Sequence, residues 1–144
     1  MRSEVKAAAR QSWKKVIAEI VIEPRWAEAL DNLDEFSHIT ILYWMHRSSG
    51  EPPVKIHPHG QKDLPIVGLF STRSPNRPNP IGKTVVRLLE RRGNVLKVQG
   101  LDAIDGTPVI DIKPYIPGND SVQDESVDGA TVPEWVRRIH EKHS

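Results

Sequence analysis

Short apolar runs, separated by residues that favour turns, recur along the chain. The run 36–45, FSHITILYWM, is almost continuously apolar and predicts a central strand buried on both faces. The segment 94–100, NVLKVQG, alternates apolar and polar residues and predicts a strand with one buried face. Further strands are predicted by the apolar runs at 15–23, 66–71, 84–89 and 109–115.

Turn and helix signals separate these runs. Residues 92–94, Arg-Gly-Asn, predict a hairpin turn between two of the strands, and the Asp-Gly pair within 104–108 predicts a second tight turn. A short helical turn is predicted at 26–33, where apolar residues recur on one side. Residues 133–140 predict a terminal helix, for which Thr131 is a suitable cap.

Three stretches show neither a strand pattern nor a helix pattern. Residues 1–15 have no consistent apolar stripe and are predicted to be irregular. Residues 48–64 are rich in proline and glycine, which predicts a long loop that is either functional, as a lid or a substrate-contacting flap, or disordered. Residues 118–131 are predicted to be a mobile polar link. The strand spacing therefore favours a mainly β fold, either an antiparallel barrel or a compact sandwich, with one or two short helices and long loops.

Length and composition narrow the class of protein. A chain of 144 residues is expected to form a single domain, 1–144, in which 118–144 are the link and the C-terminal helix. No apolar run approaches the roughly 20 residues that span a bilayer, and no signal peptide opens the chain, so we expect a cytoplasmic protein. The sequence has no cysteine, which excludes disulfides and thiolate metal sites. No Gly-x-Gly-x-x-Gly motif follows a strand, which disfavours a doubly wound nucleotide-binding fold.

Charge is distributed unevenly although the formal net charge is only +1. Residues 71–92 contain six basic residues and one acid, a net +5, whereas residues 19–35 contain six acids and one arginine, a net −5. Such segregation is typical of a basic face that binds RNA or phosphate, and solvated charge without a partner is the alternative.

The most distinctive segment is 72–83, TRSPNRPNPIGK. Its three prolines each fix φ and favour extended geometry in the preceding residue, so the segment is predicted to be a stiff, extended loop. Arg73 and Arg77 would then present guanidinium groups to an anionic ligand at low entropic cost. The alternative is a proline-rich connector with solvated arginines.

Three blocks of sequence resemble the TsaA/TrmO-like family. They are GLFSTRSPNRPNPIGKTVVRLL at 68–89, LDAIDGTPVIDIKPYIP at 101–117 and FSHITILYWMHR at 36–47. The resemblance implies a β-barrel methyltransferase that uses S-adenosylmethionine and forms a homodimer with the cofactor near the subunit interface. It also implies that the methyl acceptor is the exocyclic amine of threonylcarbamoyladenosine, beside the anticodon of tRNA. In the family a first strand precedes an Arg-Ser dipeptide; if Arg2-Ser3 is that dipeptide, this strand is missing here.

The resemblance also assigns candidate site residues. Those for the cofactor are Gln11, His46, Arg47, Arg73, Lys83, Asp105, Gly106, Thr107 and Pro108. They suit its chemistry, because arginine can bind the methionine carboxylate and exposed backbone groups can bind the adenine edge. No catalytic base is identified; Asp111, Lys113 and Tyr115 are candidates for orienting the acceptor, and a salt-bridged strand end is the alternative.

Contacts to tRNA are expected from arginines and aromatic residues. Arg77, Arg87, Arg91 and Arg92 are the candidates for phosphate contacts. Trp13, Trp26, Tyr43 and Trp44 are candidates for stacking on a base, with core packing as the alternative for the last two. His38 is expected in the core or at an interface, and no metal site is predicted around His57 and His59. Two other functions remain open: a methyltransferase acting on a small molecule, and a non-catalytic RNA-binding barrel.

Overall fold

The computed structural model describes residues 3–7, 13–45, 50–122 and 129–143. The chain divides into two compact units. The first, which we call the barrel unit, comprises residues 1–48 and 79–115, and the second, the loop unit, comprises 49–78 and 116–144. Each unit is described by itself below. The prediction of a single domain over 1–144 stays a prediction.

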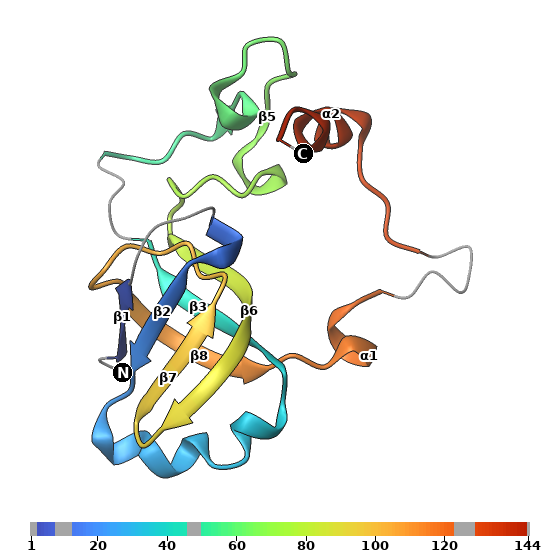
Figure 1. The fold of residues 1–144 in the computed structure, drawn as a ribbon. Coiled ribbons are helices and arrows are strands. Elements are labelled where there is room, and N and C mark those ends of the chain that lie inside the picture. The colour runs from blue at the N-terminus through green and yellow to red at the C-terminus, as the bar shows by residue number, and fades with distance from the viewer. Residues whose placement is uncertain (1–2, 8–12, 46–49, 123–128, 144) are drawn as a thin grey trace. The chain divides into compact units, whose positions relative to one another are not determined.

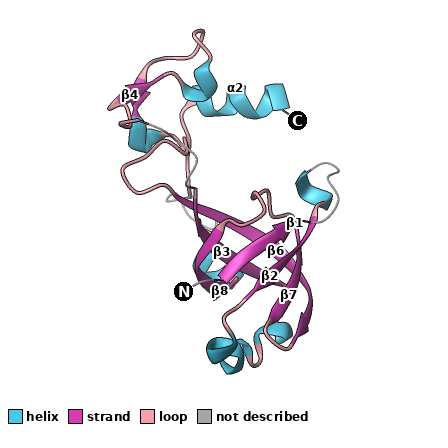
Figure 2. Cartoon of the chain, turned by 90° about the vertical axis from the view of Figure 1, so that its left-hand side faces the viewer, coloured by secondary structure: helices cyan, strands magenta, loops and turns pink. Residues whose placement is uncertain are grey.

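Six strands of the barrel unit form a closed antiparallel barrel, as predicted. Their order around the barrel is β1-β2-β7-β6-β3-β8 (Figure 1). Their bounds are β1 Ser3–Ala7, β2 Ile17–Val21, β3 His38–Trp44, β6 Ile81–Arg92, β7 Val95–Gln99 and β8 Pro108–Pro114. Figure 2 shows these strands wrapping around a common interior.

The barrel is closed by β1, a strand that the sequence analysis did not predict. Residues 1–15 were expected to be irregular, which is wrong for Ser3–Ala7 and for the 3-10 helix Trp13–Lys15. The expectation about a strand before Arg2-Ser3 stays a prediction. Val5 pairs with Ile20 of β2, and Ser3 pairs with Val109 of β8, so β1 joins the two edges of the sheet. Closure removes the open edges that would otherwise expose unpaired backbone groups.

Alternating side chains of the strands fill the barrel interior. In β6, Gly82, Val86 and Leu88 are buried while Lys83 and Arg87 are exposed. Inward-facing residues of the other strands complete the core, among them Val5, Ala18, Ile20, Ile39, Ile41, Leu96, Val98 and Val109. A period of two puts these residues on one face of each strand, which is why the alternating segments were predicted correctly.

Strand β3 is central, as predicted, and pairs with β6 on one side and β8 on the other. Ile39, Thr40 and Ile41 are consecutive buried residues, which confirms burial on both faces in this part of the strand. His38, at the start of β3, is exposed, which contradicts a place in the core. The alternative, a place at an interface, stays a prediction. Its Nδ1 lies 2.7 Å from Ser37 Oγ, and its ring packs edge-on against Tyr115.

Short 3-10 helices connect the barrel strands. They span Trp13–Lys15, Pro24–Leu30 and Leu33–Glu35, and the last two correspond to the helical turn predicted at 26–33. Leu30 and Leu33 are buried and belong to the barrel core. The hairpin predicted at residues 92–94 joins β6 to β7, and Gly93 has the positive φ of +61° that this tight turn requires.

The loop unit contains little regular structure. Two short strands, β4 Lys55–Ile56 and β5 Val67–Gly68, pair with each other and not with the barrel. The strand predicted at 66–71 is therefore wrong beyond Gly68, because Leu69–Ser71 form a 3-10 helix. The loop predicted at 48–64 also contains the 3-10 helix Pro58–Gly60.

Two α-helices lie in the C-terminal part of the chain. Helix α1 is a single turn, Pro117–Asp120, at the start of the predicted polar link. Helix α2, Glu134–His143, confirms the predicted terminal helix. Within the described ranges no helix combines the length and the apolar character needed to cross a membrane.

Candidate functional site

One end of the barrel brings together several of the predicted cofactor residues. Lys83 lies near the start of β6, the turn 104–108 leads into β8, and β3 ends between them at Trp44. Trp44 pairs with Ile81, and Met45 N donates to Pro80 O at 2.6 Å, which ties the end of β3 to the start of β6. We call this region the β3/β6/β8 end.

The interior of this end is organised by Tyr43. Its ring packs against the core, and its hydroxyl lies 3.0 Å from Thr84 Oγ1 on β6. Gly82 pairs directly with Tyr43, and a Cβ added at Gly82 would lie 2.5 Å from Tyr43 Cε2. Glycine is therefore required at position 82 for the ring to occupy its place. Tyr43 is partly buried and packs against the core, which agrees with the packing alternative and not with an exposed stacking platform.

The turn 104–108 is held tightly by its own residues and by β1. Gly106 N donates to Val5 O at 2.8 Å, and Val5 N donates to Thr107 O at 3.1 Å. Thr107 N and Thr107 Oγ1 both donate to Ile104 O, at 3.0 and 2.5 Å. The backbone N–H groups of Gly106 and Thr107 are thus already engaged, and Pro108 has none to offer. Ile104, Asp105, Gly106 and Pro108 are exposed at this turn, whereas Thr107 is buried.

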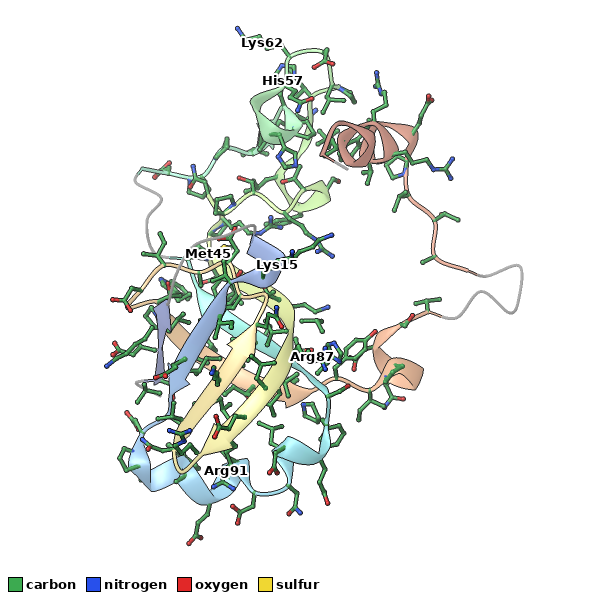
Figure 3. All side chains as sticks on the ribbon, viewed as in Figure 1. Lys15, Met45, His57, Lys62, Arg87 and Arg91 are labelled. Atoms are coloured by element: carbon green, nitrogen blue, oxygen red, sulfur yellow. The ribbon has the colours of Figure 1, made fainter. Side chains whose placement is uncertain are left out.

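The basic side chains of β6 lie at different heights along the barrel. At about 3.3 Å per residue, Arg91 lies about 26 Å from Lys83 along the strand. Figure 3 shows Arg91 beside the β6–β7 hairpin and Met45 near the opposite end of the barrel. The basic cluster that the sequence predicted at 71–92 is therefore spread over the length of the barrel and the loop unit.

Arg91 connects the β6–β7 hairpin to a 3-10 helix of the same unit. Its Nη1 donates to Asp31 Oδ1 at 2.7 Å, its Nη2 to Ala27 O at 2.8 Å, and its Nε to Gly93 O at 3.0 Å. Only 21% of the side chain is exposed. All three nitrogens are occupied, so the geometry supports a structural role for Arg91 more than a phosphate contact.

Two other predicted tRNA contacts also have internal partners. Arg92 Nη2 donates to Glu90 Oε1 at 3.0 Å in an exposed ion pair. Arg77, in the loop unit, uses its Nη1 to donate to the carbonyl oxygens of Thr72 at 2.7 Å and Ser74 at 3.1 Å. By contrast, the exposed guanidinium of Arg87 forms no hydrogen bond or ion pair with any described residue.

The candidates for orienting the acceptor lie on and after β8. Asp111 Oδ2 pairs with Lys113 Nζ at 3.1 Å, and Asp111 Oδ1 accepts a hydrogen bond from Ile112 N. This is the salt-bridged arrangement that the sequence analysis kept as the alternative. Tyr115 lies elsewhere: its ring meets His38, which pairs with Arg87 across β3 and β6. The structure therefore places Tyr115 near Arg87 on the outside of the barrel.

Arg73 lies in the loop unit, on the segment between the 3-10 helix Leu69–Ser71 and the prolines. Its side chain is exposed and, within the described part of the chain, has no hydrogen-bond or ion-pair partner. The backbone around it is held by Thr72, whose Oγ1 donates to Leu69 O at 2.7 Å and accepts from Ser74 N at 3.2 Å. The stiff loop that the prolines predict is thus reinforced by side-chain hydrogen bonds.

Three predicted cofactor residues, Gln11, His46 and Arg47, lie outside the described residues. Of the tryptophans proposed for stacking, Trp26 is exposed beside Arg25, and Trp44 is half-buried on β3. Among the described residues no group of three or more His, Asp or Glu is placed to bind a metal. His57 Nδ1 instead lies 2.9 Å from Leu64 O and holds that turn together.

Sequence reasoning missed several residues that shape the site. The Ser3–Ala7 strand alternates small or apolar with charged residues, and this alternation was the signal for β1. A glycine inside a strand often marks a close approach of another group, which was the signal for Gly82. No local pattern could reveal the contacts of Arg91, because its partner Asp31 is 60 residues away in sequence.

Comparison with known proteins gives a consistent assignment. Residues 3–121 match the family described as the tRNA-methyltransferase O N-terminal domain. An Archaeoglobus fulgidus protein described as a probable S-adenosyl-L-methionine-binding protein is 47% identical over 117 residues, which cover 81% of this chain and 31% of that protein. A mouse protein described as tRNA (adenine(37)-N6)-methyltransferase is 46% identical over 103 residues, which cover 69% of this chain and 23% of that protein.

The fold is also found in a solved structure. The crystal structure of TrmO from Pseudomonas aeruginosa superposes with a TM-score of 0.67 at 29% identity, covering 92% of this chain and 61% of that one. The chain spans less than two thirds of the length of each of these three proteins.

Proposed function

Because the chain belongs to the family of the tRNA-methyltransferase O N-terminal domain, we propose that it is an S-adenosylmethionine-dependent methyltransferase that acts on tRNA. The observation that carries this proposal is the family match over residues 3–121, which includes every barrel strand. The names of the relatives support both parts: one is described as binding S-adenosylmethionine, and another as a tRNA methyltransferase.

We propose that the methyl acceptor is the exocyclic nitrogen of threonylcarbamoyladenosine beside the anticodon. In an in-line displacement the nitrogen forms a bond to the methyl carbon while the carbon–sulfur bond breaks, leaving S-adenosylhomocysteine and releasing one proton from the nitrogen. Such a reaction depends mainly on holding the two reacting atoms about 3–3.5 Å apart and aligned. Asp111 is already paired with Lys113, so we assign it to strand structure and propose no protein base.

Within the barrel unit, we propose that the β3/β6/β8 end binds the cofactor. Lys83 offers an exposed ammonium group there, and Asp105 and Gly106 form an exposed turn that β1 holds rigid. Because Gly106 N and Thr107 N are already hydrogen-bonded, contacts to the adenine from this turn would come from the exposed residues Asp105, Gly106 and Pro108. Thr107 is 5% exposed, and its contribution would be to hold the turn through its hydrogen bonds with Val5 and Ile104. His46 and Arg47 follow β3 directly and stay candidates by sequence.

Within the loop unit, we propose that Arg73 binds the carboxylate of the cofactor. Its guanidinium has no partner among the described residues, and its backbone is held by prolines and by Thr72. A rigid, unpaired arginine can bind a carboxylate through two parallel hydrogen bonds without first breaking other contacts. Arg77 differs from Arg73 in this respect, because its Nη1 already donates to the carbonyl oxygen of Thr72.

The decisive measurement is calorimetric titration with S-adenosylmethionine of the wild type, Arg73→Ala and Arg87→Ala. We expect the wild type to bind and Arg73→Ala to lose about tenfold or more in affinity, because a hydrogen-bonded charge contributes about 1.5–3 kcal/mol. Arg87→Ala also removes an exposed, unpaired arginine and is the matched control; its affinity should equal that of the wild type. Equal affinity of all three proteins would reject the role of Arg73.

Methyl transfer is then measured with cofactor labelled in the methyl group. Transfer to tRNA that carries threonylcarbamoyladenosine, and not to tRNA that lacks it, is the expected result. Cofactor binding without transfer to tRNA would indicate a methyltransferase for a small molecule. Binding of tRNA without binding of the cofactor would indicate a non-catalytic RNA-binding barrel, and either result would overturn the proposed function.

We also propose that the protein forms a homodimer. Ile81 and Val85 on the outer face of β6 are 46% and 39% exposed, and they pair across the sheet with half-buried Trp44 and buried Thr40. Lys83 lies between these two exposed apolar side chains on the same face. The two apolar side chains support association, because burying them removes apolar area from water. Light scattering at micromolar concentration should give twice the mass of the chain; a monomer would contradict the proposal.

The expected cytoplasmic location stays a prediction.

A further inference from the structure

Phe70 is the most exposed aromatic residue for which the structure gives an exposure. It lies in the loop unit, in the 3-10 helix Leu69–Ser71, and is 77% exposed. Its neighbour Leu69 is buried and anchors the segment, with its N–H donating to Val54 O at 2.9 Å. Scattered apolar residues are common on protein surfaces, so exposure by itself carries no conclusion. The contacts between the ring and its neighbours give the evidence for a function.

The guanidinium of Arg77 packs over the ring of Phe70, with Cζ 5.5 Å from the ring centroid. The same arginine is fixed from the other direction, because its Nη1 donates to the carbonyl oxygens of Thr72 and Ser74. Phe70 is thus held by a cation–π contact to a residue that is itself hydrogen-bonded to the backbone. The ring is both exposed and held in position, so little side-chain entropy remains to be lost when a ligand stacks on it.

A flat aromatic ligand fits this surface, because it can stack on the ring of Phe70. Nucleobases stack on aromatic rings whatever their sequence, and this is a general means by which proteins bind unpaired nucleotides. The guanidinium of Arg77 adds a positive charge at the ring itself. A chain of nucleotides carries bases that can stack on Phe70 and phosphates of negative charge, whereas an acidic peptide would supply only the negative charge.

We propose that Phe70, held by Arg77, is a stacking platform for an unpaired base of the RNA substrate. The proposal rests on the proposed function, since an anticodon loop offers unpaired bases next to the modified adenosine. It assigns a base contact to the loop unit, and it gives Arg77 the task of positioning the ring in place of the phosphate contact predicted from the sequence.

The test uses an anticodon stem–loop RNA that carries threonylcarbamoyladenosine beside the anticodon and 2-aminopurine at the unpaired loop position next to it. Stacking on an aromatic ring quenches 2-aminopurine fluorescence, so this probe reports stacking separately from binding. The proteins to compare are the wild type, Phe70→Ala, Phe70→Leu and Phe70→Trp. Ile66→Ala is the matched control, because Ile66 is also an exposed apolar residue of the loop unit, at 59%.

The wild type, Phe70→Trp and Ile66→Ala should bind and quench. Phe70→Ala and Phe70→Leu should lose the quenching and bind the RNA roughly 5- to 150-fold more weakly, since stacking on one ring contributes that much to affinity. Their affinity for S-adenosylmethionine and their mass should not change, which shows that the loop unit is folded and the assembly intact.

Several results would overturn the proposal. Full quenching by Phe70→Ala would show that another group stacks on the base, and full binding by Phe70→Leu would show that apolar contact suffices. Loss of the dimer in Phe70→Ala would assign the ring to contacts between copies of the chain. The two proposals fail separately: a wild type that quenches through Phe70 but transfers no methyl group contradicts the enzymatic function and leaves the stacking platform standing.

Discussion

Three residues at the β3/β6/β8 end show how strongly single side chains depend on their neighbours. Tyr43 of β3 packs over Gly82 of β6, and its hydroxyl is within hydrogen-bond distance of Thr84, two residues further along β6. The ring fills the space that any side chain at position 82 would need. Packing and a hydrogen bond therefore join two strands next to the proposed cofactor region.

Gly82→Ala should destabilise the barrel by about 1–3 kcal/mol, which is the usual cost of overpacking. The added Cβ would lie 2.5 Å from the Tyr43 ring, so the ring must move, and its contact with Thr84 would be lost. Chemical denaturation of the purified protein measures the change in free energy of unfolding.

A double-mutant cycle identifies the cause. In the Tyr43→Ala background, where the ring is absent, adding Gly82→Ala should cost much less than in the wild type. If Gly82→Ala costs the same in both backgrounds, the ring is not the reason for glycine at this position.

At the scale of elements, β1 decides whether the sheet closes. Its backbone pairs with β2 on one side and β8 on the other, and Val5 also exchanges hydrogen bonds with the turn at Gly106 and Thr107. The strand therefore contributes to the core and holds one of the turns that we assign to the cofactor. A chain without β1 would lack this part of the core and this support for the turn.

Val5→Ala tests this contribution. Val5 is fully buried, so removing two methyl groups should lower the free energy of unfolding by about 1.5–3 kcal/mol through lost burial and the remaining cavity. Lys6→Ala, at the exposed position next to it, should change stability by less than about 0.5 kcal/mol. Thermal and denaturant unfolding of both variants measure the difference. A negligible effect of Val5→Ala would contradict the inclusion of β1 in the core.

At the scale of the whole molecule, the structure separates arginines that are available to RNA from those that are not. Arg87 is exposed and unpaired among the described residues, whereas each donor nitrogen of Arg91 has a protein acceptor. A net charge calculated over 71–92 counts the two residues equally. Their expected effects on RNA binding are different.

The dependence of tRNA affinity on salt should distinguish them. Arg87→Ala should reduce the slope of log affinity against log salt by about 0.9 for one lost phosphate contact, without a change in stability. Arg91→Ala should leave that slope unchanged and lower the free energy of unfolding by about 1–2 kcal/mol, because its partners Asp31 and Ala27 lose their donor. Equal changes of slope would mean that Arg91 leaves its internal partners to bind RNA.

Much of the fold could be predicted from local sequence patterns. A strand with one buried face alternates apolar and polar side chains along consecutive residues, so its pattern is visible in a short segment. This was sufficient for β2, β3, β7 and β8, but for only residues 84–89 of β6. Residues 81–83 were assigned to the proline-rich loop 72–83, which is wrong because β6 begins at Ile81. It failed for β1, whose alternation is hidden between alanines and charged residues, and for Leu69–Ser71, where an apolar run forms a 3-10 helix. The barrel and the candidate site residues were predicted from the resemblance of three sequence blocks to the family, because the periodicity of the strands could not indicate them.

The sequence by itself determined most of the strands, the proline-rich loop up to residue 80 and the family. Only the tertiary structure decided which groups remain available: Gly106 N is bonded to β1, Arg91 to Asp31, and Arg77 to the carbonyls that fix it beside Phe70, while Arg73 and Arg87 keep free side chains in the described structure. The physical reason is distance along the chain. Strand periods are recorded in neighbouring residues, whereas hydrogen-bond partners 41 or 60 residues apart meet only when strand order and register bring them together.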